Sequence, residues 1–164
     1  MPINLFISFE RRNLPQVNSL RDLAKSRIND LEFHDRSEIE PVLDRNGKPL
    51  RYPPSHDGAE PIKEKLTPLL DKATKMVVVI GEFTHSSAWV TWEIQYFHTR
   101  MNNKTGDAEK RLIAMYVKKA DGFTLPRILR TLSIPHIKWD IDVLTDWINT
   151  NPNQFLPTLP LLYE

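Results

Sequence analysis

Residues 76–81 read Met-Val-Val-Val-Ile-Gly and begin the part of the chain that defines the fold. A continuous β-branched run of this kind is typical of a strand buried on both faces in a parallel sheet. A helix is expected soon after it, because residues 88–98 contain no Gly or Pro. Either Ser86 or Ser87 can accept hydrogen bonds from the free amides of the first turn. The stretch therefore predicts a strand followed by a helix, which is the repeating unit of an α/β fold.

The same unit recurs along the chain. Strands are expected at residues 4–9, 31–34, 76–81, 111–117 and 134–139, and helices at 15–29, 61–73, 88–98, 125–132 and 140–149. Five alternations predict a flavodoxin-like three-layer sandwich, with a five-stranded parallel sheet of order 2-1-3-4-5. In that order strands one and three are neighbours, and ligands bind where their carboxyl ends diverge. Residues 8–9 and 86–93 should therefore flank one crevice.

Composition narrows the class of protein. A chain of 164 residues fits one domain spanning residues 1–164, and 22 Lys and Arg against 21 Asp and Glu give no overall field that favours nucleic acid. The absence of cysteine excludes disulfides, thiolate metal sites and a cysteine nucleophile. No signal-peptide pattern begins the chain, and no apolar run approaches the roughly 18 residues of a membrane span. We expect a cytoplasmic protein with neither nucleic-acid nor membrane partners.

Two segments stand outside the alternation. Residues 35–60 contain four prolines and an Asn46-Gly47 pair, with no helical or strand period. Loops beyond about 12–15 residues are usually functional lids or disordered segments, although a tolerated insertion is the alternative. This loop leaves the second strand beside the expected crevice. The Pro-spaced tail, residues 151–164, is expected to lie extended on the surface.

The helix after residue 87 carries the candidate chemistry. Trp89 and Glu93 are four residues apart and share one helix face, while Trp92 and Tyr96 form an adjacent pair at the same spacing. Glu93 should reach the crevice, where a flat indole ring would raise the carboxyl pKa or stack on a ligand ring. The alternative is ordinary core packing by the aromatic residues, with Glu93 exposed near the helix N-terminus.

The sequence gives little support for metal sites, for other nucleotide-binding motifs or for other catalytic motifs. The five histidines never show a metal-ligand spacing, so no metal is predicted. The chain has no G-x-G-x-x-G, no P-loop and no G-x-S-x-G motif. A phosphoacceptor receiver would need an aspartate cluster able to hold magnesium, whereas the first strand ends in Ser8-Phe9-Glu10.

Three segments together resemble a TIR domain, of the kind found in bacterial anti-phage proteins such as the cyclase component of Thoeris systems. The first is residues 5–9, Leu-Phe-Ile-Ser-Phe, with Arg11 close behind; the second is residues 33–37, Phe-His-Asp-Arg-Ser, which is similar to the second strand entering the family's BB loop. The third is more specific. Residues 86–93 match the spacing of S-x-x-W-C-x-x-E in NAD-cleaving TIR domains, except that Val90 replaces cysteine. The loop at residues 35–60 is also longer than the usual BB loop.

The resemblance implies roles for particular residues. Glu93 takes the place of the catalytic glutamate, and the substrate-binding residues would be Ser8, Phe9, Arg11, Asp35, Ser86 and Trp89. Phe9 and Trp89 would form walls for the nicotinamide end, and Arg11 would meet a phosphate through its forked donors. Asp35 would orient a ribose or cap the turn that begins the loop. NAD+ would be a consumed substrate and not a bound cofactor.

The resemblance also implies an activity and partners. The reaction would break the bond between nicotinamide and ribose, giving ADP-ribose or a cyclic isomer that acts on a separate effector protein. TIR active sites are often completed by the BB loop of a neighbouring copy, so a homo-oligomer formed through TIR–TIR contacts is expected. The alternative function is a non-catalytic scaffold that acts only through such homotypic assembly.

Overall fold

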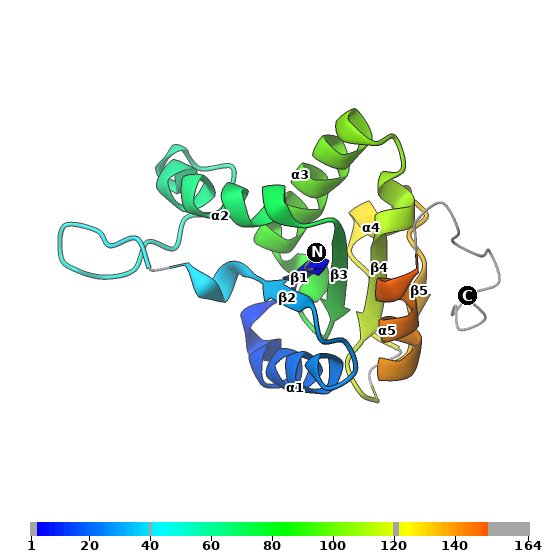
Figure 1. Ribbon diagram of the computed structural model, residues 1–164. Helices are drawn as coiled ribbons and strands as arrows, with labels where there is room; N and C mark the ends of the chain where they lie inside the picture. The colour runs from blue at the N-terminus through cyan, green and yellow to red at the C-terminus, as the bar shows by residue number, and fades with distance from the viewer. Residues whose placement is uncertain (1–2, 40, 120–121, 151–164) are drawn as a thin grey trace.

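The computed structural model describes residues 3–39, 41–119 and 122–150. Its strands are β1 (Ile3–Ser8), β2 (Leu31–His34), β3 (Lys75–Ile80), β4 (Leu112–Tyr116) and β5 (His136–Ile137). Every neighbouring pair is parallel, and the order is β2-β1-β3-β4-β5 (Figure 1). The predicted flavodoxin-like sheet is confirmed.

Helices cover both faces of this sheet. They are α1 (Leu14–Lys25), α2 (Glu60–Lys72), α3 (Ala88–Lys104), α4 (Arg127–Thr131) and α5 (Ile141–Asn149). Figure 1 shows α1 and α5 on one side, with α2 and α3 on the other.

Alternation along β1 decides which side chains face which helices. Leu5 and Ile7 belong to the core beneath α1 and α5, whereas Phe6 belongs to the core beneath α2 and α3. Because successive strand residues point to opposite faces, Ser8 lies on the same face as Phe6. The last residue of β1 therefore presents its hydroxyl toward α3.

Several elements differ in their bounds from the predictions: α1 ends at Lys25 and not at residue 29, and α4 covers only Arg127–Thr131 of the expected 125–132. Helix α3 continues to Lys104, beyond the expected end at residue 98, because Met101 is buried in the core and extends the apolar face by one turn. It ends before Gly106, whose φ of 77° suits a residue without a side chain. Strand β5 is reduced to His136–Ile137, since only this part pairs with β4.

The segment from residue 35 to residue 60 has little regular structure, as expected from its sequence. Two short 3₁₀ turns, Arg36–Glu38 and Asp57–Ala59, stand at its ends. Between them an isolated antiparallel bridge joins Leu43 and Pro49, and this part extends away from the sheet (Figure 1). The predicted surface tail, residues 151–164, lies outside the described residues. Within the described residues, no helix has both the length and the apolar character needed to cross a membrane.

Candidate functional site

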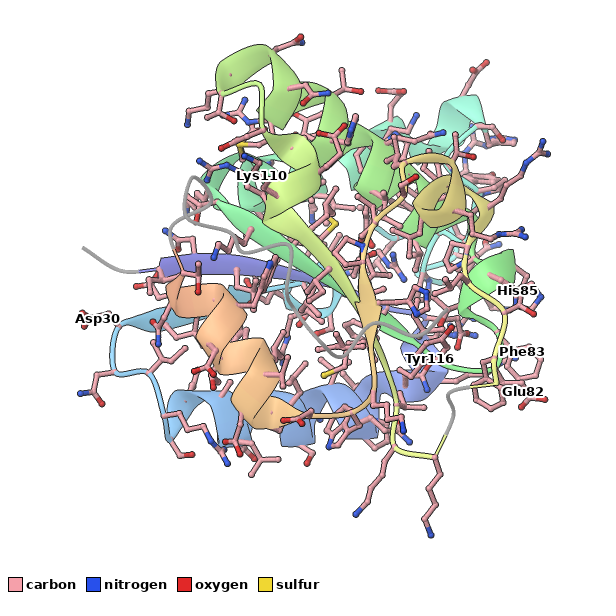
Figure 2. The ribbon with its side chains drawn as sticks, turned by 90° about the vertical axis from the view of Figure 1, so that its right-hand side faces the viewer. Asp30, Glu82, Phe83, His85, Lys110 and Tyr116 are labelled. Atoms are coloured by element: carbon pink, nitrogen blue, oxygen red, sulfur yellow. The ribbon has the colours of Figure 1, made fainter. Side chains whose placement is uncertain are left out.

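The carboxyl ends of the parallel strands lie together at one end of the sheet. Figure 2 shows Tyr116, the last residue of β4, near Glu82, Phe83 and His85, which follow β3, while Asp30 lies far from them. Ligands of open α/β sheets bind at this end.

Helix α3 starts at this end of the sheet. Ser87 is its N-cap, and its hydroxyl accepts a hydrogen bond from the Val90 amide at 3.2 Å. The Ser86 hydroxyl instead donates to the Phe83 carbonyl at 2.9 Å. Of the two serines that could begin the helix, Ser87 therefore does so. Glu93 follows in the second turn and is only 1% exposed.

Glu93 is held by residues from two other segments. The Ser8 hydroxyl donates to Oε1 at 2.7 Å, and Arg36 Nη1 donates to Oε2 at 3.0 Å. The second guanidinium nitrogen of Arg36 donates to the Phe9 carbonyl at 3.2 Å. The end of β1, the start of the segment after β2 and the helix after β3 thus meet at one carboxylate, which is the juxtaposition that the strand order predicts.

Burial and charge act in opposite directions on this carboxylate. Burial raises the pKa of Glu93 above its ordinary value, because the ionised form loses its hydration. The Arg36 cation and the hydrogen bonds from Ser8 and Arg36 counter that rise but do not cancel it. An ionised carboxylate at this position can stabilise positive charge that develops nearby, although its contact with the Arg36 cation offsets part of its own charge.

A hollow of about 550 Å³ lies next to this cluster, within the size range of small-molecule sites. Its lining residues come from the end of β1, the segment after β2 and the start of α2 and α3: Glu10, Arg11, Arg36, Ile39, Pro41, Val42, Pro49, Leu50, Arg51, Ile62, Ser87 and Trp89. The Trp89 indole donates to the Tyr52 carbonyl at 3.1 Å, which ties α3 to the long segment. Glu93 does not line the hollow, whereas Arg36 both lines it and binds Glu93.

The other residues assigned by resemblance lie in varied places. Arg11 and Trp89 line the hollow, and Ser8 binds Glu93. The Phe9 ring is 5% exposed and belongs to the core beneath α1, so the group that Phe9 turns to the site is its carbonyl and not its ring. Ser86 is exposed and outside the lining.

Asp35 had two possible roles from sequence, and the structure shows the capping one. Its carboxylate is fully buried, accepts from the Ser37 amide at 2.7 Å and from the Ser37 hydroxyl, and forms an ion pair with Arg21. These contacts fix the 3₁₀ turn that begins at Arg36. The residue that sequence reasoning missed is Arg36, although it stands next to Asp35 at the point where the chain leaves β2.

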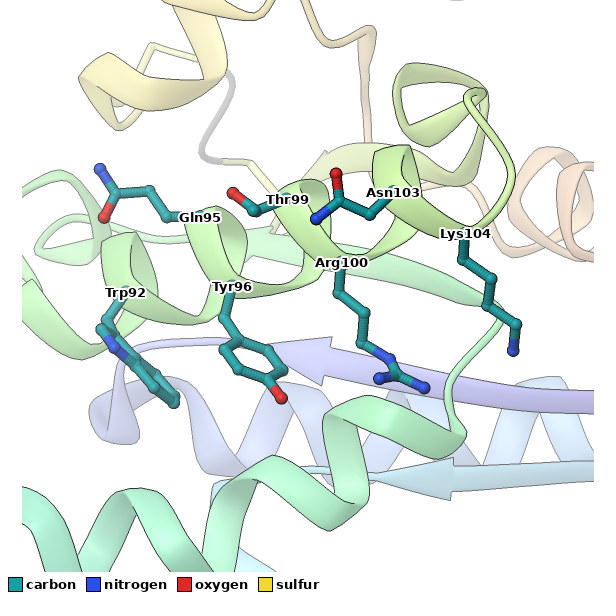
Figure 3. Close-up of a pocket in the computed structure, with 7 residues that line it drawn as sticks. All are labelled: Trp92, Gln95, Tyr96, Thr99, Arg100, Asn103 and Lys104. Carbon is teal, nitrogen blue, oxygen red and sulfur yellow. The ribbon is translucent and has the colours of Figure 1, made fainter.

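A second hollow of about 760 Å³ is lined by residues of α3 (Figure 3). Trp92, Tyr96 and Arg100 project from the same side of the helix there, and the first two rings stack with centroids 5.4 Å apart. The Tyr96 hydroxyl donates to Asp71 of α2 at 2.8 Å. This aromatic pair anchors α3 to α2, and the hollow shares no lining residue with the one beside Arg36.

Comparison with known proteins gives one family and one similar structure. The model of the family described as Thoeris protein ThsB, TIR-like domain, matches residues 6–121. Among solved structures, the fold is similar to that of a conserved protein from Enterococcus faecalis V583, with 12% sequence identity and a TM-score of 0.58 over 90% of this chain and 98% of that one. At this identity the likeness concerns the fold alone. A comparison with curated proteins finds no match.

Proposed function

This chain belongs to the family of Thoeris ThsB TIR-like domains, and we propose that it is an enzyme of anti-phage defence that cleaves NAD+ between nicotinamide and ribose. The observation that carries the proposal is Glu93: a buried carboxylate bound by Ser8 and Arg36 at the carboxyl end of the sheet, next to a hollow lined by Trp89 and Arg11.

The chemistry asks for few groups. Cleavage of a glycosidic bond to ribose develops positive charge on the sugar, and a fixed carboxylate stabilises that charge. Nicotinamide leaves as a neutral molecule, so no general acid is required. Glu93 would stabilise the ribosyl cation and hold the ribose hydroxyls, Ser8 would orient the carboxylate, and Arg11 would meet the phosphates.

The fate of the ribosyl cation sets the product. Water yields ADP-ribose, whereas a group of the same molecule yields a cyclic isomer when water is excluded. We favour the cyclic product as a diffusible signal that a separate effector protein reads. The hydrogen bond between Trp89 and the Tyr52 carbonyl links α3 to the long segment, so assembly through TIR–TIR contacts that moves this segment would reach the site.

One observation favours the alternative of a non-catalytic scaffold that acts by homotypic assembly. Glu93 is 1% exposed and paired with Arg36, and a purely structural buried ion pair has the same features. The two functions differ in whether Glu93 ever contacts NAD+.

Mass spectrometry of NAD+ and its products, after incubation with concentrated protein, tests the proposal. The matched variants are Glu93→Gln and Glu82→Gln; each replaces one carboxylate, and Glu82 is an exposed residue at the same end of the sheet (Figure 2). We expect the wild type and Glu82→Gln to consume NAD+ with release of nicotinamide, and Glu93→Gln to leave it intact. If the wild type leaves NAD+ intact even when tethered into assemblies, the scaffold function replaces this proposal.

A further inference from the structure

Glu93 cannot touch a ligand in the conformation described. Its side chain is 1% exposed, with Ser8 on one carboxylate oxygen and Arg36 on the other. Any group that comes to bind this carboxylate must first displace one of these two partners.

Arg36 is the partner that can move. Ser8 is fully buried in β1, where its backbone is in register with Val78 of β3. The Arg36 side chain is 23% exposed and lines the hollow from which a ligand would arrive. A ligand in the hollow therefore reaches Glu93 by displacing the guanidinium of Arg36.

The movement needed is confined to the side chain. The turn Arg36–Glu38 is fixed at its start by Asp35, which accepts from the Ser37 amide and pairs with Arg21. Two hydrogen bonds hold the guanidinium itself, one to Glu93 and one to the Phe9 carbonyl. Arg36 can therefore leave Glu93 by rotating about its own side-chain bonds while its backbone stays in place.

Displacing Arg36 removes the only cation that contacts Glu93 among the described residues. A buried carboxylate without a cation is strongly disfavoured, unless the incoming ligand supplies a positive charge of its own. The oxidised nicotinamide ring is a pyridinium cation, whereas the reduced dihydropyridine ring is neutral.

We propose that the Glu93–Arg36 pair sets the charge specificity of this site: the guanidinium of Arg36 is exchanged for the pyridinium of an oxidised dinucleotide, so the buried carboxylate of Glu93 binds the oxidised form in preference to the reduced one. The inference rests on the proposed function, because it takes Glu93 as the group that meets the substrate. It adds a role for Arg36 and a preference for the oxidised dinucleotide, neither of which the proposed reaction requires.

The test measures binding of two uncleavable ligands, carba-NAD+ and carba-NADH, which differ in the charge of the nicotinamide ring. Titration calorimetry is carried out at pH 8.5, well above the ordinary value of 4.5, because the pKa of Glu93 is raised and a high pH favours its ionised form. We expect the wild type to bind carba-NAD+ at least about tenfold more tightly than carba-NADH. In Glu93→Gln the two affinities should become equal within about twofold, because the buried charge is gone.

The variant Arg36→Gln tests whether the ligand displaces the guanidinium or whether Arg36 only positions Glu93. If the guanidinium must be displaced, its removal tightens binding of carba-NAD+ by about tenfold or more, because no ion pair has to be broken. The matched control is Arg11→Gln, a second arginine that lines the hollow and is exposed. We expect this variant to weaken both ligands alike, since Arg11 would meet phosphates that both carry, and so to leave their ratio unchanged.

Three results overturn the proposal: equal affinities in the wild type, unchanged or weaker binding of carba-NAD+ by Arg36→Gln, or a charge preference that survives in Glu93→Gln. Should Arg36→Gln not fold by circular dichroism, Arg36→Lys decides. Lysine keeps the charge without the fork that reaches both Glu93 and the Phe9 carbonyl, and it should tighten binding at least about threefold. If the wild type cleaves NAD+ while these results fail, only this proposal falls; if it neither binds nor cleaves, both fall.

Discussion

Two buried charges stand at opposite ends of β3, and their surroundings differ. Lys75, at the amino end, is 4% exposed, and its ammonium donates to the carbonyls of Trp147, of Ile148 at 3.0 Å and of Thr150 at 2.6 Å. Glu93, near the carboxyl end, is 1% exposed and bound by one hydroxyl and one arginine.

The partners distinguish a structural charge from the charge to which we assign a function. The ammonium of Lys75 is held by main-chain carbonyls at the end of α5, where the helix dipole also favours a cation. None of these backbone partners can leave without unravelling the helix. Glu93 is held by a side chain that borders a hollow and can rotate away. Burial of a charge therefore says little by itself, and the mobility of its partners says more.

The largest expected effect on stability is at Lys75. Replacing it by Met keeps the length of the side chain and removes the donor to three carbonyls, so Lys75→Met should lower the free energy of unfolding by about 3 kcal/mol. Chemical denaturation measures this value. Lys72→Met, at an exposed position in the same region, should stay within about 0.5 kcal/mol of the wild type. Equal values for the two variants would mean that the ammonium contributes nothing to the end of α5.

Titration of Lys75 should also make the free energy of unfolding depend on pH. Burial, and secondarily the charge of Arg111, lower the pKa of Lys75 from 10.5 to about 8. Between pH 8 and pH 10.5 the unfolded chain holds this proton and the folded protein does not, so folding is favoured as pH rises. The free energy of unfolding of the wild type relative to Lys75→Met should increase by up to about 3 kcal/mol across that range. If the difference between the two proteins does not change with pH, the pKa of Lys75 is not lowered.

A smaller effect is expected at the other end of β3. Ser8→Ala removes the hydrogen bond to Glu93 Oε1, which should lower kcat/KM for NAD+ about tenfold. Loss of a donor to the charged form also raises the pKa of Glu93, so the ascending limb of the pH–rate profile should move to higher pH. The control is Ser26→Ala, whose hydroxyl donates to the Leu23 carbonyl on the surface. A profile of unchanged shape would show that Ser8 does not act through Glu93.

The last expected effect, for which only the sign is predicted, is the contribution of Glu93 itself to stability. Its pKa in the folded protein is raised, so the folded protein holds the proton at a pH where the unfolded chain has released it. The wild type should therefore lose stability relative to Glu93→Gln as pH rises above about 4.5. An exposed, ion-paired carboxylate would give the opposite sign. Thermal unfolding of both proteins from pH 4 to pH 8 therefore distinguishes the two cases.

Much of the architecture could be predicted from the sequence, because hydrophobic runs fix buried parallel strands. The β-branched run that became β3 and the cap at Asp140, whose side chain accepts from the Val143 amide at 3.1 Å, are both found in the structure. The predicted end of α3 was wrong. The polar residues Asn102 and Asn103 suggest a loop, but Met101 is buried and the helix continues through it. Tertiary packing overrides local composition at such points.

The site was predicted less completely than the sheet. Strand order brings Ser8 and Glu93 together, and both could be named from sequence. The orientation of Phe9 could not be predicted. The alternation of side chains along a strand does not say whether the side chain of the next residue also packs in the core. Arg36 was missed because a lone arginine in a long loop has no periodicity, and only the folded chain shows that its guanidinium reaches Glu93.

One pair of variants tests the central claim that Glu93 is a functional charge and Lys75 a structural one. Turnover of NAD+, measured as release of nicotinamide, is compared with the free energy of unfolding in Glu93→Gln and Lys75→Met. We predict that Glu93→Gln lowers turnover by about a thousandfold or more while remaining folded, and that Lys75→Met loses stability but keeps its turnover when folded. Turnover that survives in Glu93→Gln, or is lost in folded Lys75→Met, would contradict the claim.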